Sequence, residues 1–382
     1  MTSKERFLTV LTGGIPDRLP ATTHHLMPYF LKKYMNGMSN AEFFKTTGLD
    51  PIVWTNPVKA DESKGDYCEV SPSGVQRILN SDWNIIEEEI PNQEYQTFRF
   101  RFVTPKGELT IIRQKNEYTS WTTEHLVKKP EDIELIAEFC TAPLCDIDEV
   151  NRQADLLGTG GMIRGHICCF DGSGQPGCWQ DAACMMGIEP LILATYDDPD
   201  WVHEFLKIIQ RRKLIYTQSL KGARYDLLEL GGGDASSTVI SPTLFDEFVA
   251  PYDEPVIAAA HEAGQRIVYH TCGGMMPILE NIAGMKTDAM ETFTPVGMGA
   301  DVDLAEAKRR IGDRVCMIGG LDQGHFFKGC TPAETRAEVR RCFEAAGAGG
   351  GYIVCPSDHF FDADPELIKA YADAAHECVY EI

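Results

Sequence analysis

The sequence predicts a (β/α)8 TIM barrel, a ring of eight parallel strands surrounded by helices, with an inserted β-rich cap. Three observations support this fold class. From Lys129 onward, short apolar segments alternate with longer helical ones, as in serial βα units. With two earlier segments, the apolar runs number roughly eight, which favours a closed barrel over an open sheet. Between about residues 60 and 128, apolar and polar residues alternate as in β-strands, which marks the insert.

Each element follows from its local pattern, and we expect a single domain over residues 1–382 because no low-complexity linker divides the chain. The strands are expected at Ala21–Met27, Leu49–Trp54, Met162–Ile167, Tyr225–Leu230, Arg266–His270, Ala289–Phe293, Val315–Ile318 and Tyr352–Cys355. The helices are expected at residues 3–12, 28–36, 39–47, 130–141, 146–155, 180–195, 198–221, 242–263, 275–283, 303–311, 332–346 and 365–379.

The insert contains a β-hairpin signal. Residues Thr97–Val103 alternate strictly between apolar and polar side chains, Thr104–Gly107 supplies a turn, and Glu108–Arg113 returns as a second strand. Such alternation means that one face is packed and the other is wet. We therefore expect a lid or cap rather than the chemical centre.

Composition limits the classes of function. A chain of 382 residues with 43% hydrophobic and 24% charged residues is expected to be globular. Its net charge of -22 argues against nucleic-acid binding, which needs a basic surface. No apolar run approaches the roughly 20 residues of a membrane span, and Met1–Phe7 lacks a secretion signal, so we expect a cytoplasmic protein. The 13 cysteines show no disulfide-framework spacing.

The strongest chemical signal follows the strand that ends at His270. His270 and Cys272 are two positions apart, so in an extended segment they can point to the same side. Imidazole and thiolate together suit zinc. Cys355, at the end of a later strand, is the best third ligand and would leave one tetrahedral position open. The alternative is that both cysteines are buried thiols and His270 is an ordinary core histidine.

Other polar residues also follow predicted strands, where a barrel keeps its active site. Glu229 and Asp234 flank a triple glycine and are candidate catalytic groups; the alternative for Glu229 is a charge that faces water. The candidate substrate- or cofactor-binding residues are His166, Gly232, Glu291 and His359. Glycine at position 232 permits close approach of a ligand to the backbone.

Four stretches carry a resemblance to a known family. They are Ser241–Tyr252, His270–Gly273, Met317–Asp322 and Gly351–Glu366. The chain resembles the uroporphyrinogen decarboxylase superfamily over nearly its whole length. Its His-x-Cys pair with a distant Cys looks like the corrinoid-linked, zinc-dependent methyltransferase branch. That resemblance implies that His270, Cys272 and Cys355 are zinc ligands.

The decarboxylase branch fits less well. Those enzymes carry a cationic segment after the first strand, typically Arg-Gln-Ala-Gly-Arg, to hold a porphyrinogen with several carboxylates. The corresponding residues here, Thr22–Tyr29, include no arginine.

The resemblance therefore implies a zinc-dependent enzyme that moves a methyl group between a corrinoid (cobalamin) and a small thiol, ether or amine. The corrinoid would arrive on a partner protein, because the chain has no Asp-x-His-x-x-Gly cobalamin motif. Two alternatives stay open: a metal-free decarboxylase acting on a tetrapyrrole, and a non-catalytic zinc-binding partner of a corrinoid protein.

Overall fold

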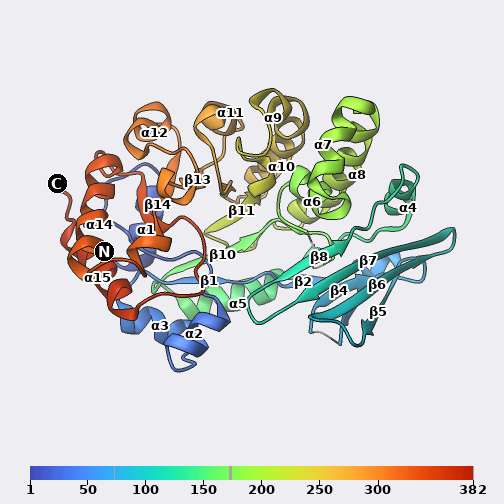
Figure 1. Cartoon of the computed structure of the whole chain (residues 1–382), viewed down its shortest axis with the longest axis horizontal. Helices are drawn as coiled ribbons and strands as arrows, with labels where there is room; N and C mark the ends of the chain where they lie inside the picture. Colours follow the sequence, from blue (N-terminus) through green and yellow to red (C-terminus); the bar gives the residue numbers. More distant parts are fainter. Residues whose placement is uncertain (73, 172–173, 382) are drawn as a thin grey trace.

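The centre of the molecule is a curled sheet of seven parallel strands, seen in the computed structural model, which describes residues 1–72, 74–171 and 174–381. Helices pack around this sheet, and a separate β-rich unit lies to one side (Figure 1). The strands, in hydrogen-bonded order, are β1 (Ile52–Trp54), β10 (Met162–His166), β11 (Leu227–Gly231), β12 (Ile267–His270), β13 (Ala289–Thr292), β14 (Cys316–Leu321) and β15 (Tyr352–Pro356). The predicted fold class is confirmed.

The gap between β15 and β1 is bridged by an extended segment at Ala21. Thr22 N–H donates to Val354 O at 3.2 Å, and Val354 N–H donates to Pro20 O at 3.0 Å. On the other side, Asp50 N–H donates to Ala21 O at 2.8 Å. The predicted strand Ala21–Met27 is therefore correctly placed but too long. Pro20 has no N–H to donate, and only isolated bridges, at Ala21 and Leu26, form in this stretch.

The helices follow the predicted order, except that two predicted helices are each divided and one short helix, α13 (Gln323–Phe326), was not predicted. Residues 180–195 are not one helix, because Gly187, at φ 94°, separates two helices. Residues 242–263 are likewise divided, at Val249, where two prolines fall in the second helix. The α-helices are α1 (Ser3–Leu11), α2 (Pro28–Tyr34), α3 (Asn40–Thr47), α4 (Asp132–Phe139), α5 (Ile147–Leu157), α6 (Cys178–Met186), α7 (Ile188–Asp197), α8 (Pro199–Gln218), α9 (Pro242–Phe248), α10 (Ala250–Glu262), α11 (Leu279–Gly284), α12 (Leu304–Ile311), α13 (Gln323–Phe326), α14 (Pro332–Ala346) and α15 (Pro365–Glu377).

Burial explains why the strands are continuous apolar runs. Every residue of β11, β12, β13, β14 and β15 is buried, as expected for parallel strands covered by helices. All 13 cysteines are free thiols, which agrees with the absence of a disulfide framework. Within the described ranges, none of the helices has both the length and the apolar character that a membrane crossing requires.

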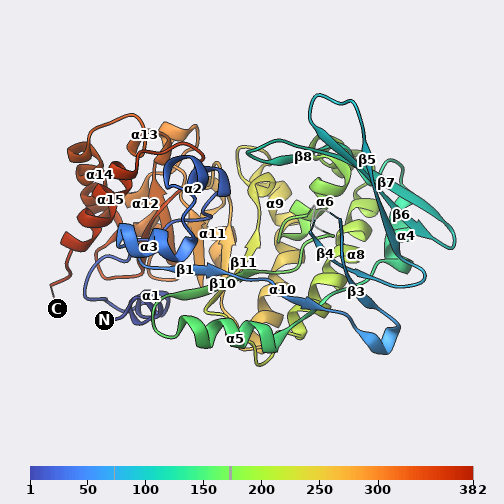
Figure 2. The same cartoon turned by 90° about the horizontal axis from the view of Figure 1, so that it is seen from below.

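The β-rich unit lies between β1 and β10 in sequence. Its main sheet is antiparallel and contains β5 (Asn84–Ile90), β6 (Gln96–Thr104), β7 (Gly107–Lys115) and β8 (Ser120–Glu124). The predicted hairpin is formed by β6 and β7, with Thr104 opposite Gly107 at its turn. Two smaller pairs, β3 (Tyr67–Val70) with β4 (Gln76–Leu79) and β2 (Val58–Lys59) with β9 (Leu144–Cys145), connect this sheet to the barrel (Figure 2). We call residues 58–127 the cap.

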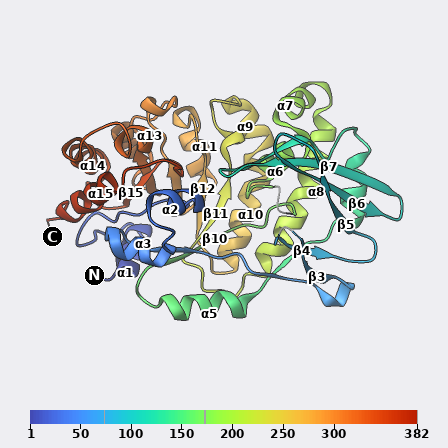
Figure 3. The same cartoon turned by 60° about the horizontal axis from the view of Figure 1, so that its bottom comes forward.

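Contacts at opposite ends of the cap attach it to the barrel. Near α6, Val127 N–H donates to Met185 O at 2.9 Å. At the opposite end, the β7–β8 turn reaches α2 (Figure 3). There the rings of Tyr118 and Tyr29 lie 4.4 Å apart, and their hydroxyl oxygens are 3.2 Å apart. The cap is thus held at both ends.

A buried ion-pair network fixes the N-terminal part of the barrel. Asp50, which immediately precedes β1, is 1% exposed and accepts from the Arg6 guanidinium at 2.7 Å. Its two oxygens also accept from Arg18 at 2.9 and 3.0 Å and from the Ala21 N–H at 3.1 Å. One carboxylate therefore connects α1, the closing segment and β1.

Replacing Asp50 with asparagine should lower the free energy of unfolding by about 3–5 kcal/mol, because Arg18 loses its buried counter-charge and Arg6 keeps only that of Asp17. Urea unfolding followed by circular dichroism measures the change. The control is Asp155→Asn, which removes the solvent-exposed partner of Arg224 and should leave the unfolding midpoint nearly unchanged. Equal effects in both variants would contradict the role assigned to this network.

Candidate active site

Polar side chains collect at the C-terminal ends of the barrel strands, as the sequence predicts. His166 ends β10, Glu229 lies in β11, His270 ends β12 and Glu291 lies in β13. Neighbouring strands pair His166 with Glu229 and His270 with Glu291, so these residues are adjacent around the ring. This end of a barrel is where catalytic residues lie in this fold.

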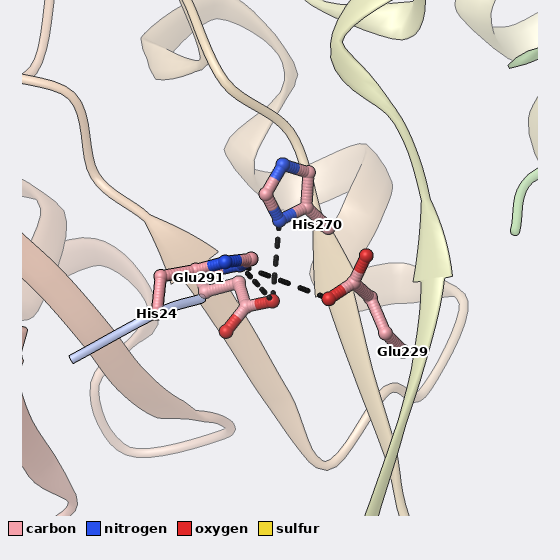
Figure 4. A group of neighbouring side chains, drawn as sticks. All are labelled: His24, Glu229, His270 and Glu291. Carbon is pink, nitrogen blue, oxygen red and sulfur yellow. Dashed lines mark hydrogen bonds and ion pairs between the residues drawn. The ribbon is translucent and has the colours of Figure 1, made fainter. Parts of the chain in front are cut away.

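Four of the polar side chains form a compact group inside the barrel. His24, Glu229, His270 and Glu291 each offer one ligand atom, and these atoms all lie within 4.8 Å of one another (Figure 4). All four residues are buried. Two imidazoles and two carboxylates form a donor set that suits a divalent transition-metal ion, so this group could bind a metal.

The surroundings of the His24 ring are consistent with a metal ion bound at this group. It is 5% exposed, and neither ring nitrogen makes a well-formed hydrogen bond. Its Nε2 lies 3.4 Å from a Glu291 oxygen and 3.7 Å from a Glu229 oxygen. A buried imidazole without a hydrogen-bond partner carries a desolvation cost. A metal ion among these atoms would remove that cost.

Arg164 in β10 carries the counter-charge of the group. It is 1% exposed and donates to both oxygens of Glu291 at 2.9 Å. A longer contact of 3.4 Å reaches Glu229, and the guanidinium lies 4.3 Å from the centroid of the Trp54 ring. Glu291 is therefore rigidly held, whereas Glu229 is held loosely.

The electrostatics of the two carboxylates differ accordingly. Burial opposes the ionisation of Glu291, but Arg164 and His24 outweigh it and hold the pKa well below its usual range. Burial raises the pKa of Glu229, although His270 opposes that shift. For His270, burial disfavours the charged form, but Glu229, Cys272 and Glu291 raise the pKa well above its usual value. The protonation states of Glu229, His270 and Glu291 therefore depend on one another.

The His270 ring has two different surroundings. Its Nδ1 lies 3.2 Å from Glu291 Oε1, while the other ring nitrogen points away from the four-residue group (Figure 4). A carboxylate on one nitrogen of a histidine commonly orients the other nitrogen toward a metal. His270 can therefore serve a metal on either side of its ring.

The two predicted cysteine ligands lie outside the four-residue group. Cys272 is half-buried and lies beside His270, whose pKa it raises. Cys355, 2% exposed in β15, lies near Glu291 and Arg164, and burial raises the pKa of its thiol. Since the compact group contains His270 but neither cysteine, the ligand set His270, Cys272 and Cys355 stays a prediction.

The glycine loop after β11 is shaped by its neighbours. A Cβ atom at Gly232 would lie 2.4 Å from the Gln180 side chain, and one at Gly233 would lie 2.6 Å from Cys272 Sγ. Asp234 accepts from Gln180 Nε2 at 2.6 Å, while its own N–H donates to Gln180 Oε1 at 2.7 Å. Gly232 and Asp234 thus hold the loop against α6, and Asp234 is not among the grouped ligand atoms.

The remaining predicted residues lie around the rim. His166 is paired with Asn56, whose amide nitrogen is 3.0 Å from His166 Nδ1. Burial and the nearby Lys213 lower the pKa of His166 to about 4, so its ring is neutral at pH 7. His359 lies 2.8 Å from the Asp358 carboxylate and is partly exposed. Neither belongs to the compact group.

The sequence did not identify Arg164 as a site residue. Arg164 interrupts an otherwise apolar strand, and a charge in a fully buried parallel strand must be paired, which is a usable signal. His24 is a metal-capable residue at the exit of the first predicted strand, which closes the ring next to β15. Only the closed barrel brings it to Glu229 and Glu291, so its partners could not be assigned from the sequence.

Comparison with known proteins identifies the family. The family model described as uroporphyrinogen decarboxylase (URO-D) matches residues 173–378. The uroporphyrinogen decarboxylase of Cellvibrio japonicus is 28% identical over 197 residues, which are 48% of this chain and 49% of the relative. That of Psychromonas ingrahamii is 31% identical over 150 residues, 38% of this chain and 40% of the relative. The chain thus spans about half the length, or less, of the curated relatives it matches.

A solved structure matches over a greater length. The "methyltransferase from Methanosarcina mazei" aligns with 99% of both chains at a TM-score of 0.63 and 15% sequence identity. At that identity the match shows a shared fold. The family model covers more than half of the chain, and the barrel agrees with it. The chain is a member of the uroporphyrinogen decarboxylase family.

Proposed function

We propose that this protein is a zinc-dependent methyltransferase that moves a methyl group between a corrinoid on a partner protein and a small thiol, ether or amine. The observation that carries the proposal is the buried group of His24, Glu229, His270 and Glu291, with its unsatisfied imidazole. The shared fold with a methyltransferase supports it.

The chain's own residues have distinct parts in this reaction. His270 is the common member of the four-residue group and of the predicted His270, Cys272 and Cys355 set, so it would hold the metal in either arrangement. Bound zinc would act as a Lewis acid that favours the thiolate form of a substrate thiol. Arg164 holds Glu291 in place, which in turn orients the His270 ring.

Glu229 is the best candidate for moving a proton. Its contacts to Arg164 and His24, at 3.4 and 3.7 Å, are long, so its carboxylate can turn toward a reactant. A carboxylate within hydrogen-bond reach of a substrate thiol or amine can accept its proton at Oε1. The depth of the group in the barrel keeps bulk water away from this step.

The names of the curated relatives favour a second candidate, decarboxylation of a porphyrinogen without metal. The described N-terminal segment offers little support, since no arginine lies in residues 22–29. The buried Arg164 is already paired with Glu291, so it is not available to a substrate carboxylate.

Purified, reduced protein should contain about one zinc ion per chain by elemental analysis. His270→Ala should reduce this to less than about a tenth, because both ligand sets include His270. Loss of metal in Glu229→Gln with retention in Cys272→Ala/Cys355→Ala would select the four-residue group, and the reverse would select the thiolates. Cys330→Ala is the control, since Cys330 lies away from the site and hydrogen-bonds to Phe326 and Thr335.

Retention of stoichiometric zinc in His270→Ala would contradict the metal assignment. Absence of zinc from wild-type protein that cannot be reloaded would favour the decarboxylase alternative.

The second test is methyl transfer from free methylcobalamin to a panel of small thiols, followed by the change in the corrinoid spectrum. Glu229→Gln should lower the rate at least ~100-fold, and retention of zinc in the same variant would assign the loss to a general base rather than to a metal ligand. Glu306→Gln, at an exposed position in α12, should leave it unchanged. Decarboxylation of uroporphyrinogen that survives Cys355→Ser, without methyl transfer, would select the alternative function.

A further inference from the structure

The inner face of the cap carries a cleft that the proposed reaction does not use. Phe98 and Phe100 in β6 and Arg113 and Lys115 in β7 lie on one face of the sheet, because alternate residues share a face and Phe98 pairs with Arg113. The cleft, of about 190 Å³, is closed by residues of β4 and of the loop after β10. It is lined by Val75, Arg77, Phe98, Phe100, Arg113, Gln114, Lys115, Ser120 and Asp171.

The lining combines aromatic rings with positive charge. Lys115 Nζ lies 5.0 Å from the centroid of the Phe98 ring, and the Arg77 guanidinium lies 5.3 Å from that of Phe100. Arg113 and Lys115 therefore line the cleft as cations beside Arg77, whose charge is balanced by Glu87, in a protein whose net charge is -22. Such a local reversal of charge attracts anions.

The two acids near the cleft have cationic partners of their own. Glu87 is committed to Arg77, with which it forms a buried ion pair. Asp171, the acid in the lining, lies 3.5 Å from Arg212 outside the cleft. Lys115 makes no ion pair with any residue in the described ranges. Burial lowers the pKa of Arg113, so an anion beside it would favour its charged form.

We propose that this cleft binds an aromatic carboxylate, with the ring against Phe98 and Phe100 and the carboxylate beside Arg113 and Lys115. A cavity of about 190 Å³ suits one ring and is too small for a tetrapyrrole or a corrinoid. The assignment concerns binding and does not depend on methyl transfer.

The position of the cleft connects it to the barrel. A second cavity, of about 260 Å³, shares Val75 and Asp171 with the first and reaches Asn56 and His166. His166 ends β10, where it pairs in register with Glu229. The second cavity thus borders both the cleft and a residue next to the candidate active site.

The test is titration of the full-length protein with benzoate, measured by calorimetry and by broadening of the benzoate proton resonances. Benzamide keeps the ring without the charge, and acetate keeps the charge without the ring. Benzoate should bind more tightly than either. Lys115→Gln and Arg113→Gln should each weaken benzoate binding roughly tenfold, the effect of losing one charge-assisted contact.

A matched control is present in the same sheet. Lys106, at the β6–β7 turn, also lies near a phenylalanine ring, at 5.9 Å from that of Phe139, but it is outside the cleft and paired with Glu138. Lys106→Gln should leave benzoate binding unchanged. The proposal is overturned if benzamide or acetate binds as well as benzoate, if Lys106→Gln weakens binding as much as Lys115→Gln, or if no benzoate binds at concentrations of about 10 mM. None of these results bears on the zinc content or on methyl transfer.

Discussion

The buried contact between Arg164 and Glu291 is the interaction on which the candidate active site depends. Two carboxylates and two imidazoles inside a barrel would be strongly unfavourable without a counter-charge. Arg164 supplies that charge from the middle of β10 and is itself packed against Trp54. It fixes Glu291, and through Glu291 the ring of His270, while Glu229 keeps some freedom. Because Arg164 holds Glu291 closely and Glu229 only loosely, Glu291 has a structural role and Glu229 is the carboxylate that can react.

Much of this architecture could be predicted from the sequence because it depends on local pattern. Apolar runs such as Ile267–Tyr269 mark buried parallel strands, and the alternation of Thr97–Val103 marks the cap hairpin. The predicted helix and strand boundaries were wrong where the backbone is interrupted within an otherwise periodic pattern of apolar residues. Gly187 divides a predicted helix, and the first predicted strand, between Pro20 and Pro28, forms only isolated bridges. Such interruptions depend on single residues, which a window average does not detect.

The site was less predictable, because its members meet across the barrel. Position at the ends of strands drew attention to Glu229, His270 and Glu291, which the structure places in one compact group. The partners of these residues come from elsewhere: His24 precedes α2, and Arg164 is an inward-facing residue in an apolar strand. Asp234 also follows a strand, but its carboxylate accepts a hydrogen bond from Gln180 and lies outside the group. Position after a strand in the sequence therefore identifies the residues at the barrel rim. Which of these residues contact one another is decided by the folded barrel.

The attachment of the cap at both ends also makes the barrel mouth asymmetric. Tyr118 and Tyr29 tie the cap down on the α2 side, so the wall that it forms cannot swing aside without breaking that contact. On the far side, the loops after β11 and β13 present the exposed side chains of Val239 and Val296. The barrel mouth is consequently bounded by the fixed cap on one side and by loops with exposed apolar side chains on the other.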